Sequence, residues 1–281
     1  MKHAFFIAAF LIILPVAWFC QTSPSVKRTI IKTDQFNFSS GGTVAITGAP
    51  NGSIQIVGSN ANEIEITAEI HLEAGTEKDL DTLAASTGFI TDESTIRTSI
   101  ITVGNNNKFG QKKMPKGMAK ELLTAPFTVN YIVRVPKYSD LEVDGGTGDL
   151  TIKGVEGSIR ANFLESNVNV EIIGGTATIA VGKGSADISF GVRGWRGRAA
   201  NIQVAEGDLT VRLPSTLSAE IDANVVRSGA IENGFPDLKP RDRKTAFTEK
   251  LIAARAGVGG GSMKFSVGTG KLRIETLRSP L

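Results

Sequence analysis

The sequence is poor in the residues that build disulfides and most metal sites, with one cysteine and two histidines among 281 residues. Cys20 has no second thiol to pair with, and the usual zinc sites need several cysteine or histidine ligands. His3 lies in an N-terminal segment that we expect to be removed. His71 then stands alone in "AEIHLEA" with no catalytic motif around it, so we expect it to face solvent on a strand. These residue types predict no catalytic residue, no metal site and no cofactor.

Aromatic residues are also scarce, at 6%, whereas there are 31 glycines. Glycine at this frequency, without the three-residue period of collagen, is typical of many turns and therefore of many short strands. Neither sign of charge dominates, because 31 basic side chains face 28 acidic ones. This balance argues against a nucleic-acid partner.

The one long apolar run lies near the N-terminus. It extends from Ala4 to Phe19, follows Lys2 and His3, is interrupted by Pro15, and precedes the polar "QTSPS". This arrangement is typical of a secretory signal peptide, which we assign to residues 1–22, with a linker at 23–35. The run is short for a membrane span, so a retained anchor is the alternative, and it would be the one contact with a membrane. We expect an exported bacterial protein of the periplasm, cell surface or extracellular space.

Short alternating strands recur along the chain. Three units near the start carry apolar pairs ten residues apart, at Val44/Ile46, Ile54/Ile56 and Ile64/Ile66. Later the leading apolar position recurs every nine residues, at Leu141, Leu150, Ile159, Val168 and Ala177. A unit this short cannot bury its own apolar face and must stack on its neighbours. We predict an all-β chain that forms a single β-solenoid over residues 36–281, in preference to a meander or sandwich of hairpins.

Three segments interrupt the repeats, and we expect short helical or loop insertions there. Residues 75–86 are predicted to form a helix that Thr76 caps, with acidic residues in its first turn. Residues 105–126 form a lysine-rich loop with room for a short helix. Residues 234–250 form a polar insertion, followed by an ambiguous apolar piece at 251–254. Insertions of this kind lie outside the stack, where binding residues are often found.

The order of these pieces resembles the bacterial putative-adhesin family, whose members are envelope or secreted domains of unknown function. The matching stretches are "NGSIQIVG" (51–58), "EIEITAEI" (63–70), the helical segment 76–85, "VNYIVRVPKYSDLEVDGGTGDLTIKG" (129–154), "GDLTVRLPSTLSAEIDA" (207–223) and "GVGGGSMKFSVGTGKLRIE" (257–275). The resemblance implies a right-handed parallel β-helix-like fold and a surface or periplasmic location. It supplies no catalytic residues. The lysine-rich loop and residues 234–250 depart from the family pattern.

The stretch "GGTGD" at residues 145–149 is close to the repeats that bind calcium in parallel β-rolls. Such a site needs successive copies that supply six or more oxygens, and here the aspartate comes one residue early in a single copy. We therefore expect Gly145, Gly146 and Gly148 to form a tight corner with positive φ, with Asp149 capping the turn.

Carboxylates could also serve a carbohydrate-active β-helix enzyme, a polysaccharide lyase or hydrolase, and this is our alternative function. The candidates at the edges of the units are Asp140, Asp144, Asp149, Asp187, Asp208 and Asp222. Aspartates also belong in turns, and the sequence shows no cluster of them. An enzyme should present a groove with three or more converging carboxylates.

Basic residues give the one candidate binding surface. It comprises Lys108, Lys112, Lys113, Lys116, Arg193, Trp195, Arg196 and Arg198. Arg241, Arg243 and Lys244 form a further group. If folding gathers them, they could bind an anionic glycan or a phosphate-rich envelope polymer, with Trp195 stacking on a sugar ring. Separate solvated loops are the simpler interpretation.

We therefore expect an exported, non-enzymatic β-repeat protein that serves in adhesion, surface interaction or envelope structure. The partner is not fixed by the sequence. An envelope glycan or a surface protein fits best.

Overall fold

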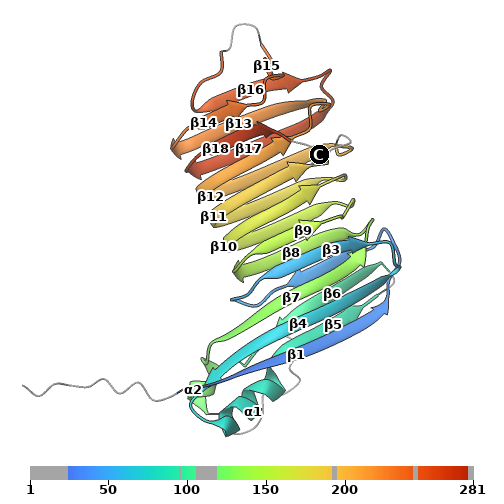
Figure 1. The fold of residues 1–281 in the computed structure, drawn as a ribbon, viewed down its shortest axis with the longest axis vertical. Coiled ribbons are helices and arrows are strands. Elements are labelled where there is room, and N and C mark those ends of the chain that lie inside the picture. The colour runs from blue at the N-terminus through green and yellow to red at the C-terminus, as the bar shows by residue number, and fades with distance from the viewer. Residues whose placement is uncertain (1–24, 95, 106–118, 192–194, 243–245, 278–281) are drawn as a thin grey trace, which may run out of the picture.

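The computed structural model describes residues 25–94, 96–105, 119–191, 195–242 and 246–277. In this part of the chain the strands form one mixed sheet of 18 strands, accompanied by two short helices. The strands lie across the long axis of an elongated molecule, with the N-terminal elements at one end and the C-terminal elements at the other (Figure 1). The all-β prediction is confirmed. The sheet is not closed and its strands are not all parallel.

The elements fall into three groups along the axis. The N-terminal group contains β1 (Val26–Asn37), β2 (Thr43–Thr47), β3 (Ile54–Ser59), β4 (Glu63–Ala74), α1 (Glu77–Ser86), β5 (Gly88–Glu93), β6 (Arg97–Val103), α2 (Lys120–Leu123) and β7 (Phe127–Pro136). The central group contains β8 (Asp140–Thr147), β9 (Leu150–Lys153), β10 (Ile159–Ile172), β11 (Ala177–Phe190) and β12 (Ala199–Leu213). The C-terminal group contains β13 (Ala219–Ser228), β14 (Ile231–Gly234), β15 (Lys239–Pro240), β16 (Leu251–Ala256), β17 (Gly261–Thr269) and β18 (Leu272–Thr276).

The central strands pair in parallel, and from β8 to β11 they repeat every two nine-residue units, whereas Ala177 of β11 lies opposite Ala200 of β12, 23 residues on. Leu141 lies opposite Ile159, and Ile159 lies opposite Ala177. Leu150 lies opposite Val168 in the same way. Hydrogen bonds between side chains link residues 18 apart, as from Asn162 to Asp144. The predicted nine-residue spacing is therefore real, and two units separate a residue from its neighbour on the next strand.

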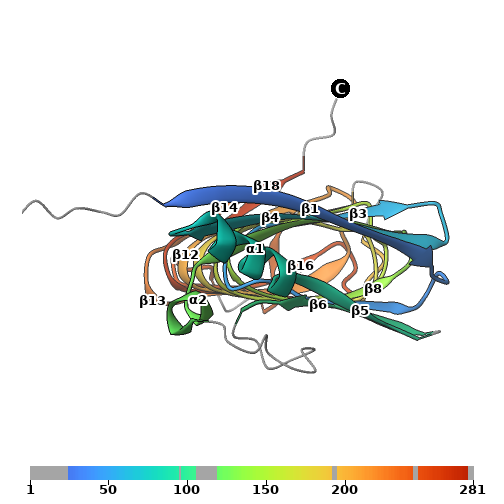
Figure 2. The ribbon, with the colours of Figure 1, turned by 90° about the horizontal axis from the view of Figure 1, so that it is seen from below.

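Each long central strand bends in its middle. In β10 the buried positions are Ile159, Ala161 and Phe163 before the bend, and Val168, Val170 and Ile172 after it. The buried apolar residues are odd-numbered before the bend and even-numbered after it. This shift of one residue lets both halves direct apolar side chains into the same core. We call the surface formed before the bend the first face, and the surface formed after it the second face. The view along the long axis shows the resulting flattened cross-section (Figure 2).

A row of glycines marks the bend. Positive φ values occur at Gly52, Gly148, Gly184, Gly207, Gly229 and Gly270. A Cβ atom on Gly207 would lie 1.6 Å from the carbonyl oxygen of Gly184, so neighbouring bends approach too closely for any side chain. Ser166 occupies the equivalent place in β10, and no non-glycine residue of the described chain has positive φ.

The prediction for the glycine-rich stretch is correct for one glycine and wrong for two. Gly148 has φ of 143°, whereas Gly145 and Gly146 have no positive φ and belong to β8. Their role is spatial: a Cβ on Gly145 would lie 2.2 Å from the Phe163 ring, and one on Gly146 2.2 Å from the Pro50 carbonyl oxygen. The Asp149 side chain accepts a hydrogen bond from Asn167 on the next strand (3.1 Å).

Antiparallel strand pairs lie at both ends of the stack of parallel strands. At the N-terminal end β1 pairs with β4, and α1 buries Leu80 and Leu83 against the core. The predicted cap is confirmed, because the backbone N–H of Asp79 donates to the Thr76 hydroxyl (3.2 Å). At the C-terminal end β16 pairs antiparallel with β13, and β15 pairs with β16. These strands cover an edge that a further repeat would otherwise occupy.

Two predicted boundaries differ from the structure. Residues 26–35, assigned to a linker, are strand and form most of β1. Residues 234–250 include the end of β14 and all of β15, and the ambiguous piece at 251–254 belongs to β16. Of the lysine-rich insertion the structure describes Asn105 and 119–126, with α2 as the short helix. Within the described chain no helix is long and apolar enough to cross a membrane.

Candidate binding groove

An open groove runs along the bend on the side of the first face. Its volume is about 590 Å³, and its lining comes from six strands, namely β8, β10, β11, β12, β13 and β17. Because these strands stack side by side, the groove follows the long axis of the molecule. It is the candidate site that the geometry supports best.

The floor of the groove is made of residues with little or no side chain. Gly182, Ala205 and Gly268 occupy it, each directly after a buried valine. A Cβ on Gly182 would lie 2.6 Å from the Leu164 carbonyl oxygen, and one on Gly268 would lie 2.3 Å from that of Ala205. Neighbouring backbones are thus too close for larger residues at the two glycines, and the hollow is a consequence of the stacking.

Aliphatic side chains border this floor. Leu164 is 74% exposed and Val226 is 65% exposed, and both line the groove. They come from strands near opposite ends of it, β10 and β13. Because three strands separate them, the two side chains border the groove at its two ends and do not form one contiguous patch.

A row of amide and hydroxyl groups follows one side of the groove. Asn162 lies opposite Asp144, and Gln203 lies opposite Ser266 on the adjacent strand. The Asn162 amide donates to the Asp144 carboxylate (2.8 Å). Asp144 is the one carboxylate in the described lining. The rim is therefore rich in neutral hydrogen-bonding groups.

Arg227 lies at the β13 end of the groove. Its guanidinium donates to the Ala205 carbonyl oxygen (3.0 Å), and its own carbonyl accepts from the Lys250 ammonium (3.1 Å). The first bond uses one of the five N–H groups of the guanidinium, and the second uses the backbone carbonyl of Arg227. This end of the groove is basic.

The second face carries several charged side chains that pair with one another. Arg212 bonds Asp187 and lies 3.4 Å from Glu275, and Arg273 bonds both Asp208 (3.2 Å) and Glu232 (3.0 Å). The Lys271 ammonium and the Arg273 guanidinium donate hydrogen bonds that hold the pKa of Glu232 below its usual value. These groups are partly or fully exposed, so each pair adds little stability, but together they compensate one another's charge.

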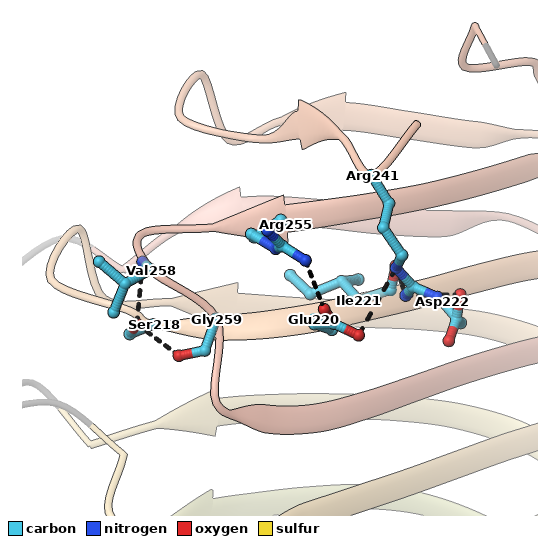
Figure 3. Close-up of polar contacts among 8 residues, drawn as sticks. All are labelled: Ser218, Glu220, Ile221, Asp222, Arg241, Arg255, Val258 and Gly259. Carbon is cyan, nitrogen blue, oxygen red and sulfur yellow. Dashed lines mark hydrogen bonds and ion pairs between the residues drawn. The ribbon is translucent and has the colours of Figure 1, made fainter. Parts of the chain in front are cut away.

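Arg241 also has acidic partners. It lies just after β15, its guanidinium donates to Asp222 (2.9 Å), and it lies 3.7 Å from Glu220. Arg255 on β16 bonds the other oxygen of Glu220 (2.9 Å). Figure 3 shows both arginines directed toward β13, with Ser218 holding the turn that follows β16. Arg241 thus fastens the C-terminal cap, whereas Arg243 and Lys244 lie outside the described residues.

The predicted basic surface is only partly described. Lys108, Lys112, Lys113, Lys116 and Arg193 lie outside the described residues. Trp195 packs edge-on against Phe190, with ring centroids 5.5 Å apart, and its ring also lies close to Gly261. Arg196 and Arg198 are exposed. These three residues precede β12, whereas the groove crosses β12 at Val204 and Ala205, so they belong to a different surface. Binding by the basic residues stays a prediction.

The candidate carboxylates are spread out and individually bonded. Asp140 accepts from the backbone of Ser158, Asp208 accepts from that of Lys271, and Asp187 bonds Arg212. No group of three metal-ligating side chains occurs in the described part of the chain. His71 is exposed on β4, where its ring nitrogens lie 3.0 Å from the Thr29 hydroxyl and 3.3 Å from the Asn130 amide. The prediction of a solvent-facing strand histidine is confirmed.

Sequence reasoning did not identify the groove, although a signal for it is present. The sequence reads "VGKG" at 181–184, "VAEG" at 204–207 and "VGTG" at 267–270. In each, a buried valine precedes a small floor residue, and the glycine two positions later has positive φ at the bend. This spacing of valine, small residue and glycine marks the floor and the bend together.

Comparisons with known proteins find likenesses of fold. A scan against protein-family models and a search of curated proteins each find no match. Among solved structures, a putative cell adhesion protein from Clostridium sporogenes matches with a TM-score of 0.43 and 12% identity, over 88% of this chain and 100% of that one. Putative adhesins from Bacteroides fragilis and Parabacteroides merdae match with TM-scores of 0.31 and 0.27, each at 12% identity over 88% of this chain and over 97% and 96% of their own chains.

The names of these structural neighbours agree with the family that the sequence resembles. Because all three TM-scores are below 0.5, they add nothing to the geometry described above.

Proposed function

We propose that the chain is an exported, non-enzymatic binding module of the bacterial cell surface or periplasm, built as a right-handed β-solenoid. Support for the solenoid comes from the parallel register, in which the chain returns beside itself after two nine-residue units. The role is adhesion to, or organisation of, the envelope. The groove along the bend is the observation that carries this proposal.

The ligand we propose is an uncharged stretch of an extended envelope glycan that lies along the long axis. The groove offers an apolar floor for the C–H faces of sugar rings and a rim of amides and hydroxyls for their hydroxyl groups. Strands in a sheet are spaced about 4.8 Å apart, close to the length of one sugar residue, and the rim presents polar groups on β10, β12 and β17, with Ala180 at the same place on β11. A linear polymer with a similar repeat can therefore make the same contacts on several strands.

The alternative function is a carbohydrate-active enzyme. Hydrolysis by paired carboxylates needs two acidic groups across the scissile bond. The described lining of the groove contributes Asp144 alone, and that carboxylate is bonded to Asn162. Binding without cleavage therefore fits this groove better.

The test fills the groove without disturbing the core. Ala205 is exposed on the floor, so Ala205→Trp should block the groove and leave folding intact. Asn169→Trp is the matched control, because Asn169 is exposed on the second face, away from the groove. Co-sedimentation of the mature chain with insoluble chitin, cellulose and purified bacterial cell walls measures binding.

We expect the parent chain to bind at least one of these polymers, Asn169→Trp to bind equally well, and Ala205→Trp to bind at least about tenfold more weakly. Equal binding by both variants would show that the groove is not the site. Release of soluble sugar during incubation would favour the enzyme instead.

A further inference from the structure

Strand β1 presents an unpaired edge at the N-terminal end of the sheet. It is 12 residues long, and every residue from Val26 to Asn37 pairs with β4. Among the described strands none pairs with its other edge. The backbone N–H and C=O groups along such an edge can accept another strand. Seen from below, β1 runs along one side of the molecule and β5 along the other, with α1 between them (Figure 2).

The solvent side of β1 carries an aliphatic residue at its centre. Ile31 is 66% exposed, and Thr29 and Thr33 flank it on the same side of the strand. Threonine and isoleucine are strong strand formers and pair well across strands. An exposed isoleucine at the middle of a free edge is the opposite of what protects edges from pairing, namely a charge or a proline at that place.

We propose that two copies of this chain pair antiparallel through β1, with Ile31 opposite Ile31 of the second copy. On the solvent side Thr29 then lies opposite Thr33 of the second copy, and Lys27 lies opposite Gln35. On the inner side Arg28 lies opposite Asp34, and Val26 lies opposite Phe36. Each of these contacts occurs twice except the Ile31–Ile31 pair, which lies on the two-fold axis.

Charge selects this register over its neighbours. Centring the pair on Ile30 would put Arg28 opposite Lys32, and centring it on Lys32 would put that residue opposite itself. Like charges directly opposite each other destabilise a strand pair. Centring the pair on Thr33 avoids this clash and places Lys32 opposite Asp34. However, that register pairs only residues 29–37, and it places Ile31 opposite Gln35. The Ile31 register engages the strand from Val26 to Phe36.

The charges on the inner side of β1 already have partners within one chain. Arg28 donates to Asp81 (2.7 Å) and Glu77 (2.6 Å) on α1, so two acids fix the guanidinium beside the edge. Asp34 of the second copy would approach a cation that these acids already neutralise, so the solvent-side contacts centred on Ile31 carry the pairing. Since β1 continues through β4, β7, β3 and β9 to the second face, the dimer would join the second faces of two copies into one sheet.

Oligomeric state is the first test. Light scattering on the mature chain should give a dimer mass, and Ile31→Lys should give a monomer, because it places two ammonium groups opposite each other. Val258→Lys is the control, since Val258 is also an exposed aliphatic residue but lies between β16 and β17 in the C-terminal group. A parent chain that stays monomeric up to about 100 μM, well above the dissociation constants of stable homodimers, would overturn the proposal.

Cysteine cross-linking tests the register. Residues 23–281 contain no cysteine. In the mature chain, Ile31→Cys should therefore form a disulfide-linked dimer under copper–phenanthroline oxidation, because directly opposed residues have Cβ atoms about 5 Å apart. Thr33→Cys should not, since the two thiols would be roughly four residues, about 13 Å, out of register. Preferential cross-linking of Thr33→Cys would overturn the Ile31 register, and cross-linking of neither would overturn pairing through β1.

Discussion

At the scale of single residues, the bend depends on glycine because glycine has no Cβ atom. Gly207 has φ of 130°, and its neighbour's carbonyl oxygen occupies the space where a Cβ would lie. Two separate costs therefore fall on any substitution there, one from the backbone conformation and one from the steric clash. The same two costs apply along the row at Gly184 and Gly270.

Gly207→Ala should lower the free energy of unfolding by about 2–4 kcal/mol, measured by urea denaturation. Gly75→Ala is the matched control, because a Cβ there would meet nothing within 4 Å and its φ is not positive. We expect that variant to stay within about 0.5 kcal/mol of the parent. Similar stability of the two variants would show that the bends can relax without cost.

Tyr131 is a second residue whose surroundings give a measurable signal. Burial raises its pKa to about 12, and a hydrogen bond with the Thr102 hydroxyl acts in the opposite direction (2.8 Å). The folded state thus holds the phenol proton more tightly than the unfolded state, whose pKa is about 10. The resulting stability is fully present below pH 10 and is lost as the pH rises from 10 toward 12.

In a Tyr138→Phe background Tyr131 is the only tyrosine, so phenolate absorbance should titrate with a midpoint near pH 12. Over the same interval the free energy of unfolding should fall by about 2 kcal/mol. A midpoint near 10 without unfolding would mean that water reaches the hydroxyl in the native state.

At the scale of elements, the alternation of apolar and polar residues along the sequence identified the strands whose apolar side chains pack into the core. The apolar pairs of β2, β3 and β4 and the nine-residue series in β8 to β11 are all buried, as predicted. The helix α1 was also predictable, because its cap and first turn are local features. These signals depend on residues close together in the sequence.

Elements at the two ends of the stack were harder to predict. The inward positions of β1 include Arg28, Lys32 and Asp34, since they contact helix α1 and the start of β5 instead of an apolar layer. That mixed pattern resembles a linker. The apolar piece in β16 is too short to separate strand from helix, and its pairing with β13 settles it. The groove was missed for a related reason, because its walls meet only when residues 18 or more apart stack.

At the scale of the whole molecule, the repeat predicts how the chain tolerates changes in length. Inserting a second copy of 159–176 after residue 176 adds one full repeat, so every following side chain keeps its face. Inserting 168–176 alone adds half a repeat and moves first-face positions to the second face. Local units that contact only their neighbours should accept the first change and not the second.

We expect the longer insertion to fold cooperatively and to lengthen the molecule by about 4.8 Å, the spacing of one strand, as measured by small-angle scattering. The shorter insertion should unfold or aggregate. Equal behaviour of the two variants would count against a repeat of two units, and with it against the proposed solenoid.

The paired charges on the second face make it chemically different from the surface that carries the groove. We call the second face the back of the molecule. A partner that approaches the back meets cations and anions already committed to each other, whereas the groove along the bend offers an apolar floor, a rim of amides and hydroxyls, and the Arg227 guanidinium at one end. Adsorption to a polymer should therefore be one-sided, with a fixed orientation. Chains bound in this orientation would cover one polymer molecule without cross-linking it to a neighbouring one through the second face.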